Sequence, residues 1–357
     1  MTQPILTHGG DWYGFQAEHG DRPFLDFSAN VSPLGMPSGV QLAIRAAIPQ
    51  ADRYPDPLCR SLRDALAAHC GVPAEWILCG NGAADLIWRA VLALHPRRAL
   101  VTAPAFAEYE AALAAAGCRV DRYLLRSEQD FALDEGFLAR IRHGVDLVFL
   151  CQPNNPTGVA VPRPLLYRIA EKCRAVGARL ILDACFTDFM DDPETASLQD
   201  RLADWPWVLE LRAFTKLYAM AGVRLGWCLC ADTRLLARMQ ACGQPWAVSA
   251  LAQAAGEAAL EEQLYVTSVR ALILSQRGRL ADGLRALGLR VVPGQANFLL
   301  FQSPVPLLEP LRQKGILLRS CGNYTGLDDS WYRCAVRTGP ENDILLQALE
   351  EVLRHGN

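Results

Sequence analysis

Short apolar runs alternate along the chain with longer stretches in which apolar residues recur every three or four positions. The helical periodicity covers residues 83–94 and 164–176. The apolar runs lie at residues 76–79, 99–102, 147–151, 180–182, 208–211 and 225–230. Continuous apolar strands between amphipathic helices are typical of a mostly parallel sheet with helices on both faces. The pattern therefore predicts an α/β fold.

The pattern changes after residue 231. A mainly helical stretch over 232–287 leads to shorter strands at 289–292, 297–301 and 332–337 and to a closing helix over 341–353. The beginning of the chain, rich in Gly, Pro and Asn, has neither pattern. We therefore expect three parts, which are an N-terminal arm (1–45), a large domain (46–250), and a linking helix with a small α+β domain (251–357).

Composition and charge exclude several classes of protein. The chain has 357 residues, of which 51% are hydrophobic, and a net charge of −3 without a block of like charge that would attract nucleic acid or an anionic membrane. The N-terminus lacks the pattern of a signal peptide, and no apolar run is long enough to span a membrane. The 12 cysteines are scattered without a C-x-x-C pair, so we expect neither a metal site nor disulfides. These features predict a globular, cytoplasmic protein with neither a nucleic acid nor a membrane as its partner.

One lysine stands in an unusual setting. The chain has only three lysines, and Lys216 lies in the apolar segment Ala-Phe-Thr-Lys-Leu-Tyr-Ala-Met-Ala-Gly at 213–222, with no acidic residue nearby in sequence. Burial without an acidic partner favours the neutral amine. We therefore expect Lys216 to have a lowered pKa and to act as a nucleophile.

Four sets of polar residues follow apolar runs, and one of them consists of Lys216 and Arg224. A glycine turn, Gly-Asn-Gly-Ala-Ala-Asp at 80–85, leads into a helix and can hold a phosphate, although it lacks the third glycine of a dinucleotide motif. Asn155 lies in Gln-Pro-Asn-Asn-Pro-Thr-Gly, Asp183 ends a buried strand, and Arg224 follows Lys216 by eight residues. Each set alone has an ordinary structural explanation. Together they match the phosphate, ring nitrogen, ring oxygen and aldehyde of pyridoxal 5′-phosphate.

In this order the motifs resemble the aspartate aminotransferase superfamily of pyridoxal phosphate enzymes, fold type I, over essentially the whole chain. The resemblance implies a large cofactor-binding domain (46–250) with a mostly parallel seven-stranded sheet flanked by helices, and a small α+β C-terminal domain. The resemblance further implies an N-terminal arm (1–45) that packs with the small domain and the active site. It also implies that Lys216 binds the cofactor covalently, that Asp183 pairs with the ring nitrogen and that Asn155 binds the ring oxygen. These three are the expected catalytic residues.

The same resemblance implies further cofactor contacts. Phe106 is expected to stack on the ring, and Tyr54 is expected to reach the cofactor phosphate from the other subunit of a homodimer with shared active sites. The remaining expected phosphate ligands are Gly82, Ala83, Ala84, Thr215 and Arg224. Two features depart from the family. Ala83 and Ala84 stand where relatives carry a hydroxyl or acidic side chain, and Phe186 cannot supply a phenol to the ring oxygen.

The ends of the chain resemble more closely one branch of the superfamily. The segments that carry this likeness are His-Gly-Gly at 8–10, Leu-Asp-Phe-Ser-Ala-Asn-Val-Ser-Pro-Leu-Gly at 25–35, Pro-Ala-Phe-Ala-Glu-Tyr at 104–109, Pro-Trp-Ala-Val-Ser at 245–249 and Leu-Arg-Ser-Cys-Gly-Asn-Tyr-Thr-Gly-Leu at 318–327. That branch decarboxylates O-phospho-L-threonine to (R)-1-amino-2-propanol O-2-phosphate and CO2, for the aminopropanol arm of cobalamin (adenosylcobalamin) biosynthesis. The likeness implies the same reaction here.

The implied substrate has two anionic ends, which need local cations or N–H donors. The resemblance places Arg337 at the α-carboxylate, with help from Asn155 and the backbone near Asn30. It places the phosphate at His8, Gly9, Arg319 and Asn323.

Two other functions remain open from the sequence. A transaminase like histidinol-phosphate aminotransferase shares the cofactor motifs, and its reaction differs from decarboxylation by a rotation about one substrate bond. A non-catalytic module that binds pyridoxal phosphate, such as the effector domain of a transcription regulator, would need an N-terminal helix-turn-helix, and the chain begins almost at the arm.

Overall fold

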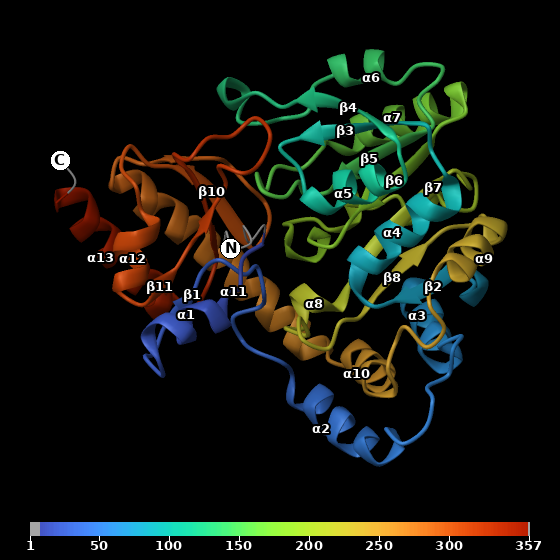
Figure 1. Ribbon diagram of the computed structural model, residues 1–357, viewed down its shortest axis with the longest axis horizontal. Helices are drawn as coiled ribbons and strands as arrows, with labels where there is room; N and C mark the ends of the chain where they lie inside the picture. The colour runs from blue at the N-terminus through green and yellow to red at the C-terminus, as the bar shows by residue number, and fades with distance from the viewer. Residues whose placement is uncertain (1–7, 356–357) are drawn as a thin grey trace.

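The large part of the molecule is built on one seven-stranded sheet. The computed structural model describes residues 8–355, so residues 1–7 of the expected arm lie outside the described part. The seven strands are β2 (Ile77–Gly80), β3 (Arg98–Ala103), β4 (Arg119–Leu124), β5 (Leu147–Cys151), β6 (Arg179–Asp183), β7 (Val208–Ala213) and β8 (Gly226–Leu229). Their order is β2-β8-β7-β6-β5-β3-β4, and only β8 runs antiparallel to its neighbours (Figure 1). The predicted α/β fold with a mostly parallel sheet is confirmed.

Both faces of this sheet are buried, which explains its continuous apolar strands. Along β5, Phe149 packs into one hydrophobic cluster and its neighbours Val148 and Leu150 pack into the other. The first cluster is covered by α4 (Gly82–Leu94), α5 (Ala107–Ala115) and α9 (Thr233–Cys242), and the second by α3 (Arg60–Cys70), α7 (Arg163–Val176) and α10 (Ala250–Leu260). Alternate residues of a strand point to opposite faces, so a sheet between two helical layers needs apolar residues at every position.

Two elements differ from the sequence-based expectation. Strand β4 was not expected, because it lies at the edge of the sheet, pairs only with β3 and has a half-exposed, charged sequence. The helical stretch over 232–287 is divided into α9, α10 and α11 (Gln263–Ala286). The loop before α10 contains Pro245, and the Ser249 hydroxyl accepts a hydrogen bond from the Ala252 N–H, which caps the new helix.

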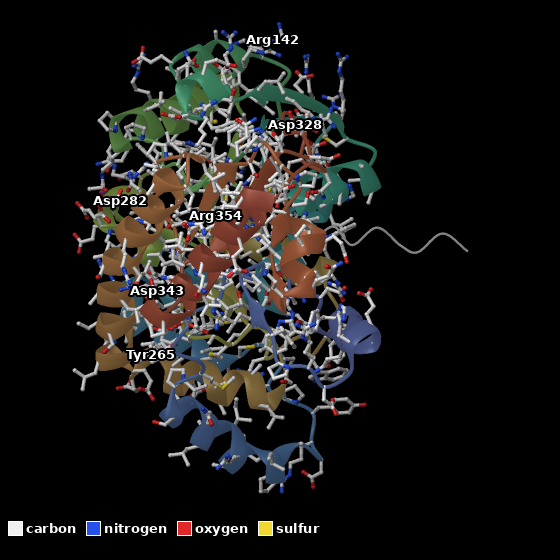
Figure 2. The ribbon with its side chains drawn as sticks, turned by 90° about the vertical axis from the view of Figure 1, so that its left-hand side faces the viewer. Arg142, Tyr265, Asp282, Asp328, Asp343 and Arg354 are labelled. Carbon is white, nitrogen blue, oxygen red and sulfur yellow. The ribbon has the colours of Figure 1, made fainter. Side chains whose placement is uncertain are left out.

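A second, antiparallel sheet forms the small part of the molecule. Its strands, in the order β12-β13-β10-β9, are β12 (Arg319–Ser320), β13 (Trp331–Ala335), β10 (Phe298–Gln302) and β9 (Arg290–Val291). The helices α12 (Leu308–Gln313) and α13 (Gly339–His355) lie beside it, and α11 runs from it toward the large part (Figure 1). Charged side chains such as Asp282 of α11 and Asp343 and Arg354 of α13 lie on the outer surface (Figure 2).

The arm contacts both parts of the molecule. Its first elements are α1 (Trp12–His19) and β1 (Leu25–Asp26), and β1 pairs in parallel with β11 (Ile316–Leu317) of the small part. Farther along, the Ser32 N–H donates to the carbonyl oxygen of Lys216 at 2.9 Å. The hydroxyl of Tyr265, at one end of α11 (Figure 2), lies 2.8 Å from Ser32 Oγ. The arm then continues into α2 (Ser38–Ala47), which packs on α10.

The length and apolar character of the described helices decide whether any of them could cross a membrane. Among residues 8–355, no helix combines the length and the apolar character that crossing a bilayer requires.

We predict that Gly226→Ala lowers the free energy of unfolding by about 2 kcal/mol, because overpacking a tight site has a cost of this size. A Cβ at Gly226 would lie 2.7 Å from the Ala83 nitrogen and 3.0 Å from the Arg212 oxygen, and backbone atoms cannot easily move away. The control is Gly278→Ala in the middle of α11, where a Cβ meets nothing within 4 Å. That variant should be more stable by up to about 1 kcal/mol. Urea unfolding of both variants measures the difference, and equal midpoints would contradict the prediction.

Candidate active site

A cavity of about 910 Å³ lies where the carboxyl ends of the parallel strands meet the arm and the small part of the molecule. Strand β5 leads to Asn155, β6 ends at Asp183, and β7 leads to Thr215 and Lys216 in the short helix α8 (Phe214–Leu217). The side chains at this edge converge because parallel strands end at the same edge of a sheet. The cavity therefore gathers residues that are far apart in sequence.

Lys216 has the chemical character expected from its sequence. Burial, together with the positive charges of Arg333 and Arg224, lowers its pKa to about 8. Its Nζ lies 5.7 Å from the centre of the Phe186 ring, and this apolar contact gives the ammonium no counter-ion. The neutral amine, which is the nucleophilic form, is therefore well populated near neutral pH.

Asp183 is a buried carboxylate held by hydrogen-bond donors. The hydroxyl of Tyr109 donates to Asp183 Oδ2 at 2.6 Å, and the Cys185 N–H donates to Oδ1 at 3.1 Å. Burial and the Asp183 charge raise the pKa of the Tyr109 hydroxyl well above its usual value, so Tyr109 stays a donor. The carboxylate is therefore fixed in orientation at the cavity wall, where it can pair with a cationic ring nitrogen.

The N-terminus of α4 forms the part of the cavity suited to a phosphate. Gly82 has φ +78°, and a Cβ there would lie 2.8 Å from Arg224 Nη2, so the guanidinium packs directly on the glycine. Ala83, Ala84, Thr215 and Arg224 also line the cavity. Asp85 is turned to local contacts, because its carboxylate accepts from the Asn81 N–H and from Arg89. Helix N–H groups and a guanidinium without a facing carboxylate make an anion site.

A second anion site of the cavity lies at Arg333. The guanidinium of Arg333, a β13 residue, donates to Asn155 Oδ1 and, at 3.0 Å, to the carbonyl oxygen of Ser28. The amide of Asn30 also faces it, and in the orientation that satisfies both groups its oxygen lies 3.1 Å from Arg333 Nη1. Arg333 is only 5% exposed, and within residues 8–355 it forms no ion pair with a carboxylate. A buried cation in this state favours an anionic ligand.

Arg337 also lines the cavity, but its guanidinium is already engaged. Its Nη2 lies 2.6 Å from Glu341 Oε1, and its Nη1 donates to the Asp26 carbonyl oxygen at 3.1 Å. The pairing with Arg337 and Thr338 lowers the pKa of the Glu341 carboxyl despite its burial. Asn155 and Asn30, which were expected to assist Arg337, are instead partners of Arg333.

The arm and the 318–327 segment supply the far end of the cavity. His8, Gly9 and Arg319 line it, and the Arg319 Nη2 donates to Asn323 Oδ1 at 2.9 Å. Asn323 itself lines an adjoining hollow of about 310 Å³ on the other side of Arg319. The residues expected to bind the substrate phosphate therefore lie close together. Asn323 is linked to the main cavity by its hydrogen bond with Arg319.

Two expected aromatic contacts have different surroundings. Phe106 lines the cavity at the start of α5, where its ring lies 5.6 Å from the His8 ring and 5.7 Å from the Tyr109 ring. Tyr54 is 79% exposed, stacks on Trp246 and does not line the cavity of its own chain. A single copy of the chain therefore does not bring Tyr54 to the expected cofactor site.

Sequence reasoning missed three residues of this site. Arg333 is a charge within an otherwise apolar strand, Trp-Tyr-Arg-Cys-Ala, and that contrast could have marked it. Tyr109 lies three residues after Phe106 and so lies near it on the same helical turn. Glu108 lines the cavity beside His8 and carried no signal in the sequence. In the part of the chain that the structure describes, no group of three potential metal ligands is close enough to hold a metal ion.

The residues present fit pyridoxal 5′-phosphate. The glycine cradle at Arg224 suits its phosphate, the fixed Asp183 carboxylate suits its ring nitrogen, and the Lys216 amine suits its aldehyde. The donor Nδ2 of Asn155 stays available to a ring oxygen, because Oδ1 already accepts from Arg333.

Comparisons with known proteins agree with this geometry. The family model "Aminotransferase class I and II" matches residues 22–349. The chain is 41% identical to a threonine-phosphate decarboxylase from Salmonella typhimurium, over 97% of this chain and 96% of the relative. It is 34% identical to a histidinol-phosphate aminotransferase from Symbiobacterium thermophilum, over 96% of this chain and 94% of the relative. A crystal structure of histidinol-phosphate aminotransferase from Sinorhizobium meliloti in complex with pyridoxal-5′-phosphate is similar with a TM-score of 0.86 and 27% identity, over 98% of this chain and 96% of that chain.

We predict that Lys216 in the cofactor-free protein reacts with acetic anhydride at a rate that is half-maximal near pH 8, because only the neutral amine reacts. Mass spectrometry of the digested protein over a pH series measures this rate, with Lys172 and Lys314 as internal references for the reagent. Arg333→Gln removes a repelling charge, so the midpoint should move to higher pH. A midpoint that does not move would contradict the proposed electrostatic contribution of Arg333.

Proposed function

The chain belongs to the aminotransferase class I and II family, and on that premise we propose that it decarboxylates O-phospho-L-threonine to (R)-1-amino-2-propanol O-2-phosphate and CO2. As a member of this family the chain is an enzyme that depends on pyridoxal 5′-phosphate. The proposal includes a role in the aminopropanol arm of cobalamin biosynthesis. It is supported by the 41% identity to the decarboxylase from Salmonella typhimurium.

The observation that carries the proposal is the pair of cationic sites besides the cofactor cradle. Arg333 lies buried beside Lys216 with no carboxylate paired to it among the described residues. Arg319 and His8 lie at the arm end of the same cavity. Two separate sites suit a substrate with a carboxylate at one end and a phosphate at the other.

We assign the α-carboxylate to Arg333 instead of Arg337. The oxygen acceptors around Arg333 orient its guanidinium but leave its charge uncompensated, whereas Glu341 compensates Arg337. A bidentate contact between a guanidinium and a carboxylate fixes both the distance and the plane of the carboxylate. In this assignment Arg337 is a cation in the cavity wall, and Glu341 holds its guanidinium in place.

Bound in this cavity, pyridoxal phosphate supplies an electron-accepting ring that takes up the negative charge left at the substrate Cα. The protein's own contribution is orientation and proton placement. Arg333 on one side and His8 with Arg319 on the other hold the substrate by both ends, which sets the rotation about the bond between Cα and the carboxylate carbon. Asp183, held by Tyr109, keeps a proton on its cationic partner, and Lys216 Nζ is placed to return a proton to Cα.

We also propose that the enzyme is a homodimer whose active sites are shared. Tyr54 is exposed and stacked on Trp246, which is itself 42% exposed, so the pair presents a large apolar surface. The apolar side chains of Leu42, Ile48 and Leu58 are also exposed in the same part of the chain. Exposed apolar surface of this kind is typical of a protein interface.

Transamination of histidinol phosphate is the second candidate. The 34% identity to the Symbiobacterium thermophilum enzyme and the structural similarity to the Sinorhizobium meliloti enzyme favour it. A transaminase uses the same cofactor residues and a different orientation of the substrate bonds. Because the chain is an enzyme of this family, the non-catalytic module has no support.

The first test uses the purified holoenzyme and O-phospho-L-threonine labelled at C1. We expect release of labelled CO2 together with aminopropanol phosphate, without any keto acid, because the carboxylate leaves as CO2 and the amine is kept. A parallel reaction contains histidinol phosphate and 2-oxoglutarate. Glutamate in that reaction, with no labelled CO2 in the first, would identify a transaminase.

A second test separates the two arginines. Arg333→Met should lower kcat/KM for O-phospho-L-threonine by about 100-fold or more, because loss of a buried, hydrogen-bonded cation costs 2–5 kcal/mol. Arg337→Met, the matched control four residues away, should lower it by less than about 10-fold, because Glu341 already compensates that charge. The absorbance of bound cofactor checks that both variants fold. A larger loss in Arg337→Met than in Arg333→Met would return the carboxylate to Arg337.

A further inference from the structure

His8 of the arm and Glu108 of α5 meet across the cavity. The His8 Nε2 and the Glu108 Oε1 lie 3.0 Å apart, and both residues line the cavity. His8 is 47% exposed and Glu108 is 23% exposed, so the contact lies at the solvent side of the cavity. One partner comes from the arm, which pairs with the small part of the molecule, and the other from the large part.

Both partners of this contact are held by further interactions. The Trp88 Nε1 donates to the second oxygen of Glu108 at 3.2 Å, so the carboxylate is anchored to α4 as well as α5. On the arm, a Cβ at Gly9 would lie 2.2 Å from the Ser28 oxygen, which shows how closely the backbone after His8 passes over Ser28. The Gly10 N–H donates to Ser28 Oγ at 2.7 Å. His8 is therefore aimed at Glu108 from a fixed backbone.

The hydrogen bond also determines how His8 can act. A carboxylate oxygen accepts, so Nε2 of His8 carries a proton in this contact, and Nδ1 can donate to a phosphate oxygen when the ring is protonated on both nitrogens. The ring of His8 lies 5.6 Å from the ring of Phe106, which limits its rotation. A second group that fixes the orientation of a histidine is a common way to prepare it for a ligand.

A carboxylate at this place needs an explanation, because the cavity is suited to anions. Asp26 is occupied by the Ser28 backbone and by Trp12, and Asp183 by Tyr109. Glu108 is instead bonded to Trp88 and to a histidine of the arm. Left without His8, its charge would repel a phosphate bound nearby.

We propose that Glu108 is a positioning residue that holds His8 across the cavity and thereby sets the preference for a phosphate-bearing substrate over its non-phosphorylated counterpart. The inference rests on the proposed function, in which His8 binds the substrate phosphate. Glu108 does not touch the reacting atoms. It therefore contributes to substrate binding and leaves the chemical step to Lys216, Asp183 and Arg333.

The steady-state test compares Glu108→Ala with Glu110→Ala. Glu110 lies on the same helix and pairs with Arg122 outside the cavity, so it is a matched control. We expect Glu108→Ala to raise KM for O-phospho-L-threonine by about 5- to 10-fold with kcat within about 2-fold, and to leave kcat/KM for L-threonine unchanged. Glu108→Gln keeps an oxygen acceptor for His8 and should restore most of the binding. A fall in kcat at constant KM, or an equal effect on both substrates, would overturn the proposal.

A double-mutant cycle tests the coupling directly. If Glu108 acts through His8, then Glu108→Ala added to His8→Ala should raise KM no further than His8→Ala alone. Independent, multiplying effects would show that Glu108 does not act through His8.

A measurement that needs no substrate tests this inference independently of the proposed reaction. Hydrogen exchange of the arm amides in the holoenzyme should become faster in Glu108→Ala than in wild type and stay unchanged in Glu110→Ala, because the contact that joins the arm to α5 is lost. If wild type releases no CO2, the proposed reaction fails while this measurement still reports on the contact. Unchanged arm exchange in Glu108→Ala would overturn the positioning role whatever the reaction is.

Discussion

Repulsion among the cations around Lys216 is the constraint on which the rest of the site depends. Arg333 and Arg224 both lower the pKa of Lys216, in addition to the effect of burial. Burial of Lys216 and Arg333 strengthens such repulsion, so the arrangement is costly for the empty protein and favourable once anionic groups enter. The neighbours of Arg333 fit this purpose, because Asn155 and the Ser28 carbonyl orient the guanidinium without neutralising its charge.

The cations around Lys216 and the groups that orient them come from separate helices, strands and loops. Helix α4 and the segment that follows α8 bring Gly82 and Arg224 together, strand β13 brings Arg333, and the arm brings Asn30 and Ser28. Each cation is thus placed by a different part of the chain. The hydrophobic clusters on the two faces of the sheet contain none of these charged residues, so the core of the large part is packed without them.

How much the sequence predicts depends on how local the physical cause is. The strands β5, β6 and β7 were predicted because burial on both faces makes them apolar throughout, and the edge strand β4 was missed because it lacks that burial. The cofactor motifs were recognisable because each follows a strand directly. The choice between Arg333 and Arg337 was not, because Arg333 is oriented by Asn155 and Ser28 from distant segments, although Glu341 lies only four residues after Arg337. The contact between His8 and Glu108 spans 100 residues and leaves no pattern.

The position of His8 in the cavity wall has a practical consequence for anyone who wishes to immobilise the enzyme on a solid support. Attachment at His8 would place the linker at the wall of the cavity, because His8 is at once an arm residue and a lining residue. Helix α13, in contrast, ends at His355 on the outer edge of the molecule, away from the cavity (Figure 1). A surface anchor through α13 therefore leaves the entrance free and keeps the catalytic face turned to the solution.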